Sequence, residues 1–203
     1  MKIHLLAPAA LLVLAVTAPA QQTKPTIIGE GGGVDDYGST RVLYWNTKAD
    51  SSAGQFAINY GRPVWKEDYE DPAKFDAMTK GKVWRMGKNF WTNLDTCLPL
   101  KISGKSVAPG YYYLGLQRSQ DGANWSLAFI DPAKVRSAHG DAFEIQKAEV
   151  EFTVPMTLGK AQGVAEKLTI TLSYPEASPK KVTIKVAWGN LALTAPIEAT
   201  VPE

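Results

Sequence analysis

The sequence predicts an all-β protein, an antiparallel β-sandwich (jelly-roll-like or an open barrel) with one or two short helices. Apolar and polar residues alternate through most of the chain, which is the period of half-buried strands. Turn residues divide the alternating runs into about eight or nine short strands, a pattern typical of sandwiches and barrels. Helix signals are confined to two brief segments.

The strands are expected at residues 42–45, 55–60, 94–102, 111–117, 125–130, 148–154, 168–174, 182–187 and 191–197. In the C-terminal third, Leu168, Ile170 and Leu172 alternate with polar residues, as in an antiparallel sheet with one wet face. Gly189-Asn190 is a two-residue hairpin signal between the last two strands. Pro99 cannot donate to a ladder, so it indicates an edge or a bulge in the third strand.

The two helical segments begin with the same tetrapeptide, Asp-Pro-Ala-Lys, at residues 71–74 and 131–134. Aspartate is a good N-cap, and proline suits the first helical position because its missing amide hydrogen is not needed there. We expect a short helix or helical turn at each place. The repeat reflects capping chemistry rather than a duplicated domain.

The first 20 residues predict a cleavable signal peptide. Lys2 is followed by an apolar run, and Ala18-Pro19-Ala20 supplies a small-residue cleavage site. The only cysteine is Cys97, so a lipoprotein is not expected, and the protein is predicted to be periplasmic or secreted. Residues 21–40 are interpreted as a flexible leader, and residues 41–203 as a single β-sandwich domain.

Charge and composition exclude several function classes. Of 22 basic side chains only Lys2 lies in residues 1–20, which leaves 21 basic and 20 acidic groups in the mature chain. Such a balance does not steer a protein toward nucleic acid, and we expect no membrane span after signal cleavage. Cys97 has no internal disulfide partner and is expected to be buried as a small apolar residue. The oligomeric state is left open.

Catalytic and metal-binding signals are weak. His139 is the only histidine of the mature chain, so a multi-histidine zinc site is excluded and no cofactor is predicted. We assign no catalytic residue. A carboxylate-dependent hydrolase remains an alternative, with its acids drawn from Glu67, Asp68, Glu70 and Asp71, or from Asp95.

The segment Val83–Thr92 is the strongest functional signal from the residues themselves. It places Trp84, Arg85, Asn89 and Trp91 within ten positions, together with a glycine that an ordinary strand would not need. A loop that directs polar groups at a ligand has this composition. An alternative is that the same side chains brace the scaffold.

The chain resembles a bacterial family known as domain of unknown function 2911. The resemblance is carried by Tyr60-Gly61-Arg62-Pro63, Trp84-Arg85-Met86-Gly87-Lys88-Asn89-Phe90-Trp91-Thr92, Ala108-Pro109-Gly110-Tyr111-Tyr112-Tyr113-Leu114, Trp125, Trp188-Gly189 and Pro196-Ile197. It covers about residues 42–198 and implies an exported bacterial sandwich-like domain with no assigned reaction. The family commonly has Ala-Asn-Glu in the loop where this chain has Lys88-Asn89-Phe90, so the acid is missing here.

These observations favour a non-catalytic binding module for a carbohydrate or a carboxylate-bearing ligand. The predicted ligand-binding residues are Tyr60, Arg62, Trp84, Arg85, Asn89, Trp91 and Thr92. Three of their rings would form one aromatic platform, and Arg62 and Arg85 would lie close together as donors. An envelope interaction or structural domain that uses exposed sheet edges is a further alternative.

Overall fold

A computed structural model describes residues 27–202, which divide at Val34/Asp35 into two units; the fold below is that of the second unit. Its strands are β1 (Tyr37–Asn46), β2 (Ser51–Gly61), β3 (Val83–Trp84), β4 (Thr92–Thr96), β5 (Leu100–Ile102), β6 (Lys105–Val107), β7 (Gly110–Arg118), β8 (Trp125–Ile130), β9 (Val150–Gly159), β10 (Ala165–Ser173), β11 (Lys181–Gly189) and β12 (Leu191–Ala199). The helices are α1 (Pro72–Thr79), α2 (Pro132–Ser137) and the short 3-10 helices η1 (Glu67–Tyr69) and η2 (Ala142–Lys147). The all-β prediction is confirmed.

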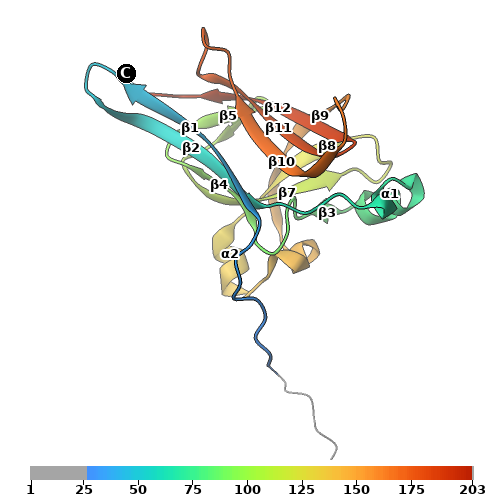
Figure 1. Ribbon diagram of the computed structural model, residues 1–203. Helices are drawn as coiled ribbons and strands as arrows, with labels where there is room; N and C mark the ends of the chain where they lie inside the picture. The colour runs from blue at the N-terminus through green and yellow to red at the C-terminus, as the bar shows by residue number, and fades with distance from the viewer. Residues whose placement is uncertain (1–26, 203) are drawn as a thin grey trace, which may run out of the picture. The chain divides into compact units, whose positions relative to one another are not determined.

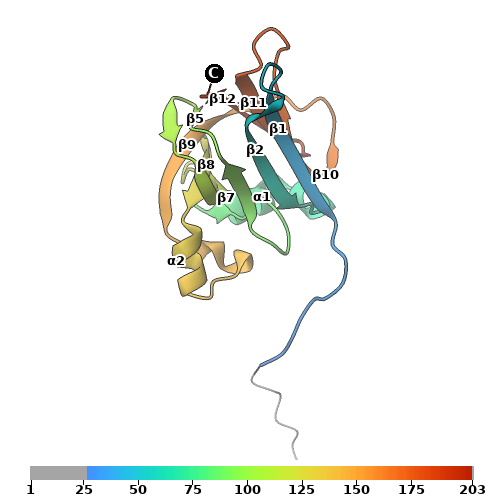
Figure 2. The same ribbon diagram turned by 90° about the vertical axis from the view of Figure 1, so that its left-hand side faces the viewer.

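The strands form one antiparallel sheet whose main path has the order β1-β2-β4-β7-β8-β9-β12-β11-β10 (Figures 1 and 2). Outside this path β3 pairs with β7, and β5 pairs with β12 and β6. Strand β9 joins its two halves, because residues 150–156 pair with β8 and residues 157–159 pair with β12. The chain also passes between the halves where β4 ends at Thr96 and β5 begins at Leu100. The break that Pro99 predicted is this crossing between the halves of the sheet.

Side chains connect the two ends of the sheet, where β1 and β2 face β10. The Tyr60 hydroxyl donates to the Ile170 carbonyl (3.2 Å) and accepts from the Ile170 amide (2.9 Å). The Leu172 amide donates to the Thr40 hydroxyl at 3.3 Å. These bonds satisfy backbone groups at an edge strand that would otherwise lack partners. The sheet is therefore an open barrel whose seam is bridged by side chains.

The main core fills the space between the two halves of the sheet. Alternate residues of each strand enter it, such as Phe56 and Ile58 from β2 and Val182, Ile184 and Val186 from β11. A second, smaller core lies under α2 and η2 and contains Tyr113, Ile130, Val135 and Ile145. Strands β7 and β8 are thus covered on both faces over part of their length.

Both helices begin as the repeated tetrapeptide predicts. The Asp71 carboxylate accepts from the Ala73 amide, and the Asp131 carboxylate accepts from the Ala133 amide, at 2.8 and 2.7 Å. Proline occupies the first turn in each case. No helix within residues 27–202 is long and apolar enough to cross a membrane.

Two local expectations are wrong. The first strand begins at Tyr37 instead of near Arg41, because Tyr37 pairs with Gly61 and the Arg62 amide donates to the Asp36 carbonyl. Cys97 is exposed rather than buried, because it follows the end of β4 on the outward side; its thiol bonds the backbone of Gln55. The predicted signal peptide, residues 1–20, lies outside the described residues.

Candidate functional site

The loop between β3 and β4 is held in place by the residues on which its backbone packs. The Thr92 hydroxyl is fully buried and donates to the Met86 carbonyl at 2.6 Å. A Cβ atom on Gly61 would come within 2.0 Å of the Lys88 carbonyl oxygen, so the loop backbone lies directly on the end of β2. Met86 and Asn89 both have positive φ angles, 48° and 62°, a conformation that is costly for a residue such as methionine. The loop shape is held by packing.

The upper part of this loop forms one wall of an open groove of about 290 Å³. The groove runs over the outer face of β1, β4 and β7 and is completed by the segment before η2. We call it the aromatic groove, and it is lined by Tyr37, Asn89, Phe90, Trp91, Asn93, Tyr111, Tyr113, Gly140 and Asp141.

The aromatic rings of the groove are partly open to solvent. Tyr37, Phe90 and Tyr111 are 46%, 47% and 40% exposed, and because they lie in one groove they form a patch instead of scattered single rings. Trp91 stacks on Tyr113 with centroids 4.7 Å apart and planes 12° from parallel. That stack holds the Trp91 ring in place, because the ring cannot rotate without losing its contact with Tyr113.

A hydrogen-bonded row of polar side chains on β1, β2 and β4 ends at Asn93, which lines the groove. The Ser39 hydroxyl donates to the Asn59 side chain (2.8 Å), which donates to the Asn93 side-chain oxygen (3.1 Å). Strand register places these residues side by side on β1, β2 and β4, with Tyr113 next on β7. The row orients the Asn93 amide, so its remaining hydrogen-bonding capacity has a fixed direction.

Three further side chains set the chemistry of the groove. The Asn89 amide donates to Asp35 at 2.5 Å, which fixes the exposed tip of the loop. Burial raises the pKa of the Tyr111 phenol, so this group stays protonated and can donate at neutral pH. The Arg136 guanidinium of α2 lies over the Tyr111 and Tyr113 rings, 5.7 and 5.9 Å from their centroids.

Five of the seven predicted site residues do not line the groove: Tyr60, Arg62, Trp84, Arg85 and Thr92. Tyr60 is 4% exposed and both bonds of its hydroxyl go to Ile170. Arg62 donates to the Leu168 carbonyl at 3.2 Å and lies 4.0 Å from Asp36. The Thr92 hydroxyl bonds inside the loop. Trp84 stacks on Trp188 at 4.7 Å.

The expected single platform is therefore not formed, because Tyr60, Trp84 and Trp91 take three different neighbours. Arg85 lies with its guanidinium 5.5 Å from the Phe143 ring centroid, whereas Arg62 bonds β10. The two arginines serve separate contacts rather than one donor pair. Asn89 and Trp91 are the predicted residues that the structure brings together, in the aromatic groove.

Sequence reasoning missed Tyr37, Phe90, Asn93, Tyr111 and Tyr113. The alternation within Tyr111-Tyr112-Tyr113 puts the first and third rings on one face, so the sequence pattern could have indicated these two residues. Tyr37 was missed because the glycine-rich stretch before it suggested a leader. Its place in the groove depends on pairing with Gly61, a contact distant in sequence.

A second gathering of aromatic rings lies at one end of the barrel, under α1. We call it the buried aromatic cluster; it consists of the buried Trp125 and Trp188 and the partly buried Trp65, Tyr69, Phe75 and Trp84. It encloses a cavity of only about 60 Å³. Its ring faces contact each other, which leaves little surface for a ligand.

The acids considered for hydrolysis have structural partners or stand apart. Asp71 caps α1, and Asp68 accepts from the Lys74 ammonium at 2.5 Å, which lowers the pKa of the Asp68 carboxyl. A general acid at neutral pH needs a raised pKa instead. Asp95 is exposed on β4, where its strand partners are Ala57 and Tyr111. Within residues 27–202, no three His, Cys, Asp or Glu side chains gather as metal ligands would.

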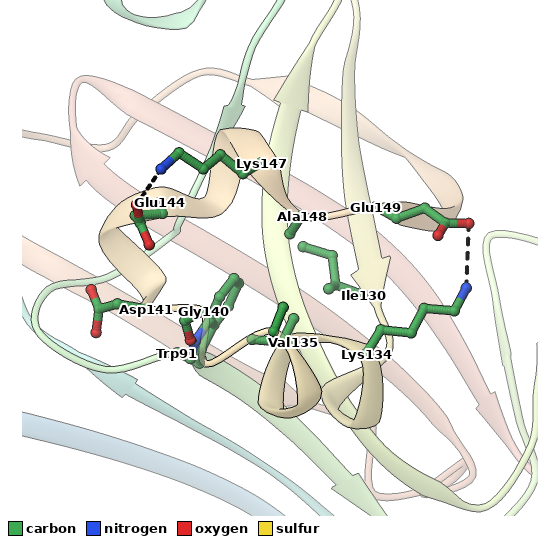
Figure 3. A pocket seen from close by; sticks show the side chains of 11 residues that line it. Trp91, Ile130, Lys134, Val135, Gly140, Asp141, Glu144, Lys147, Ala148 and Glu149 are labelled. Carbon is green, nitrogen blue, oxygen red and sulfur yellow. Dashed lines mark hydrogen bonds and ion pairs between the residues drawn. The ribbon is translucent and has the colours of Figure 1, made fainter.

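A pocket of about 370 Å³, shown in Figure 3, adjoins the aromatic groove, because Trp91 lines both. It lies between α2 and η2 and over β8. Its lining is Trp91, Ile130, Lys134, Val135, Ala138, Gly140, Asp141, Glu144, Lys147, Ala148 and Glu149. The Glu149 carboxylate, which Lys134 approaches to 3.3 Å, raises the pKa of that ammonium group, so Lys134 is charged at neutral pH.

Taken together, the fold and the groove define an all-β, open-barrel protein with exposed aromatic and amide groups on its outer face. A family model matches residues 45–197, and the chain belongs to that family, which is described as a protein of unknown function, DUF2911. The resemblance seen in the sequence is confirmed. No curated protein and no solved structure matches the chain.

Proposed function

We propose that the protein is a non-catalytic carbohydrate-binding module and that its ligand lies in the aromatic groove. One observation carries the proposal: exposed rings and oriented amides line the same concave surface. The face of an aromatic ring is electron-rich and attracts the positively polarised C–H groups of a sugar ring. Amide and phenol groups beside the rings would bond the sugar hydroxyls and fix its orientation.

A carbohydrate is better supported than a carboxylate-bearing ligand. The groove lining contains one acid, Asp141, and no basic side chain, and the nearby Arg136 guanidinium lies over the Tyr111 and Tyr113 rings. Two arginines suggested a carboxylate ligand, but both have other partners. Arg62 donates a hydrogen bond to β10, and Arg85 lies over the Phe143 ring. A ligand with many hydroxyls and no charge suits this surface. A carboxylate on the ligand would be costly to bury without a cationic partner, and an uncharged sugar avoids that cost.

The test is calorimetric titration with a panel of methyl glycosides and neutral trisaccharides. Tyr111→Ala removes a ring that is 40% exposed in the groove, and we expect affinity to fall about tenfold or more, as for a ring at the centre of an interface. Tyr174→Ala is the matched control, since Tyr174 is 48% exposed and does not line the groove. Equal affinities for the two variants, or no binding to any sugar, would contradict the proposal.

We also propose that the protein is exported, on the evidence of the N-terminal sequence. A charged residue, an apolar run and a small-residue cleavage site precede Gln21. Mass spectrometry of the protein from the cell envelope or medium should give a chain that begins at Gln21. A chain that retains Met1 in the cytoplasm would contradict export.

A further inference from the structure

The pocket beside the aromatic groove has an apolar floor. Ile130 and Val135 are 1% and 7% exposed and belong to the second core, against which Ala148 packs. In Figure 3 these three side chains lie between α2 and η2. A volume of about 370 Å³ falls within the range of small-molecule sites, roughly 300–1,000 Å³. The floor therefore offers apolar contacts to a group of several carbon atoms.

The rim of this pocket is charged, and its lysine and glutamate side chains lie in ion pairs within the protein. Lys134 lies 3.3 Å from Glu149 on one side, and Lys147 pairs with Glu144 on the other (Figure 3). The Asp141 carboxylate accepts from the Phe143 amide at 2.7 Å. An ionic ligand would have to compete with these pairs, whereas an apolar group could enter between them. The rim thus disfavours a charged group on the portion of a ligand that enters the pocket.

The pocket and the groove share a wall. Trp91, Gly140 and Asp141 line both. The wall is fixed from both ends, since the Trp91 indole donates to the Gly140 carbonyl at 3.5 Å and the Gly140 amide donates to the Val135 carbonyl at 2.9 Å. A ring stacked in the groove beside Trp91 would lie next to the entrance of the pocket.

From this continuity we infer that the ligand is an amphiphilic saccharide, whose sugar ring occupies the groove and whose alkyl or acyl substituent enters the pocket. The inference rests on the proposed function and adds the chemical class of the ligand. Transfer of a methylene from water to an apolar site strengthens binding about fourfold. A chain of a few carbons would therefore dominate the affinity of an otherwise weakly held sugar.

The experiment compares methyl and hexyl glycosides of the same sugar by calorimetry, at concentrations below micelle formation. We expect the hexyl glycoside to bind the wild-type protein at least about tenfold more tightly, since even partial burial of five added methylenes exceeds that factor. Ala138→Phe would fill the pocket from its exposed rim. It should leave methyl glycoside binding unchanged and remove the gain from the longer chain.

Ala133→Phe is the matched control, because Ala133 is exposed on the same helix and does not line the pocket. Equal dissociation constants for the two glycosides in the wild-type protein would overturn the inference and leave the proposed function standing. A chain-length gain that survives Ala138→Phe would overturn it as well, because the chain would then lie elsewhere. Failure of both glycosides to bind would overturn the proposed function and the inference with it.

Discussion

The buried aromatic cluster and the aromatic groove contain similar residues but differ in what their ring faces contact. In the cluster, Trp188 meets Trp84, Trp65 and Tyr69 at centroid distances of 4.7, 4.9 and 5.0 Å, and it is 5% exposed. In the groove, Phe90 meets Tyr37 edge to face at 5.6 Å and is 47% exposed. The first arrangement stabilises the fold, and the second leaves ring surface for a ligand.

The comparison teaches that aromatic density in a sequence does not distinguish a core from a site. Trp84 and Trp91 are seven positions apart in one motif, yet one belongs to the cluster and the other to the groove. The chain between them crosses the end of the sheet, so the two side chains point to different sides of the sheet. Mutations that separate stability from binding are the way to test this division.

The largest expected effect is on stability and comes from Trp188→Ala. The side chain loses three ring contacts and the bond from its indole to the Pro63 carbonyl (3.0 Å), so unfolding free energy should fall by about 3–5 kcal/mol. Trp91→Ala is the matched control, and its loss should be smaller, because Trp91 is half-buried and stacks on Tyr113 alone. Urea unfolding measures both. Equal losses would break the distinction between cluster and groove.

The next effect concerns the junction that holds the groove loop. Gly61→Ala places a methyl group 2.0 Å from the Lys88 carbonyl oxygen, so the loop backbone must move, and we expect a loss of about 1–3 kcal/mol. Sugar affinity should fall too, because the same loop positions Asn89 and Trp91.

Gly159→Ala provides the control for that substitution. Its Cβ would lie 3.8 Å from the Ala192 carbonyl oxygen, an ordinary contact, and stability should stay the same or rise by up to about 1 kcal/mol. A Gly61→Ala protein as stable as wild type would show that the loop is not packed on β2 as described.

The sequence predicted the strands and helix caps well, because those signals are local. Alternation placed every long strand, and Asp71 and Asp131 marked the helix starts. The 3-10 helices η1 and η2 and strands β3 and β6 were missed; the two strands are only two and three residues long, so no alternation can develop in them. Short elements are stabilised by neighbours that are distant in the chain, and the local sequence does not indicate which residues these are.

The candidate site was predicted only in part, because its geometry depends on distant pairings. The motif lies in the loop that forms one wall of the groove, which Asn89 and Trp91 line. Nothing local indicated that Tyr60 would turn toward Ile170 of β10, 110 positions away. The same tertiary contact that removes Tyr60 from the surface closes the barrel seam.

A pH effect should distinguish the cluster from the groove, because α1 covers the cluster through an ion pair. Asp76 lies 2.7 Å from both Lys80 and Arg118, and these partners hold the pKa of its carboxyl below the ordinary value. The pair therefore stabilises the fold above the unfolded pKa of about 3.9, and the stabilisation is lost as pH falls through the lower folded pKa.

The measurement compares wild type with Asp76→Asn in urea at neutral pH and at steps below about pH 4. Wild type should be the more stable at neutral pH, and the difference should shrink as the solution becomes more acidic. Glu70→Gln is the control, since the exposed Glu70 forms no ion pair within the described residues. A difference between wild type and Asp76→Asn that stays constant down to strongly acidic pH would exclude this role for Asp76.

The smallest stability effect should come from Phe90→Ala. The ring is half exposed and touches Tyr37 edge to face, so its removal should cost less than about 1 kcal/mol. Phe75→Ala in the cluster should cost more, because Phe75 packs against Trp65 and Trp125 and lies beneath Arg118. Binding of the methyl glycosides should reverse this order, with Phe90→Ala the weaker binder. If Phe75→Ala weakened binding more while remaining folded, the ligand site would belong to the barrel end and not to the groove.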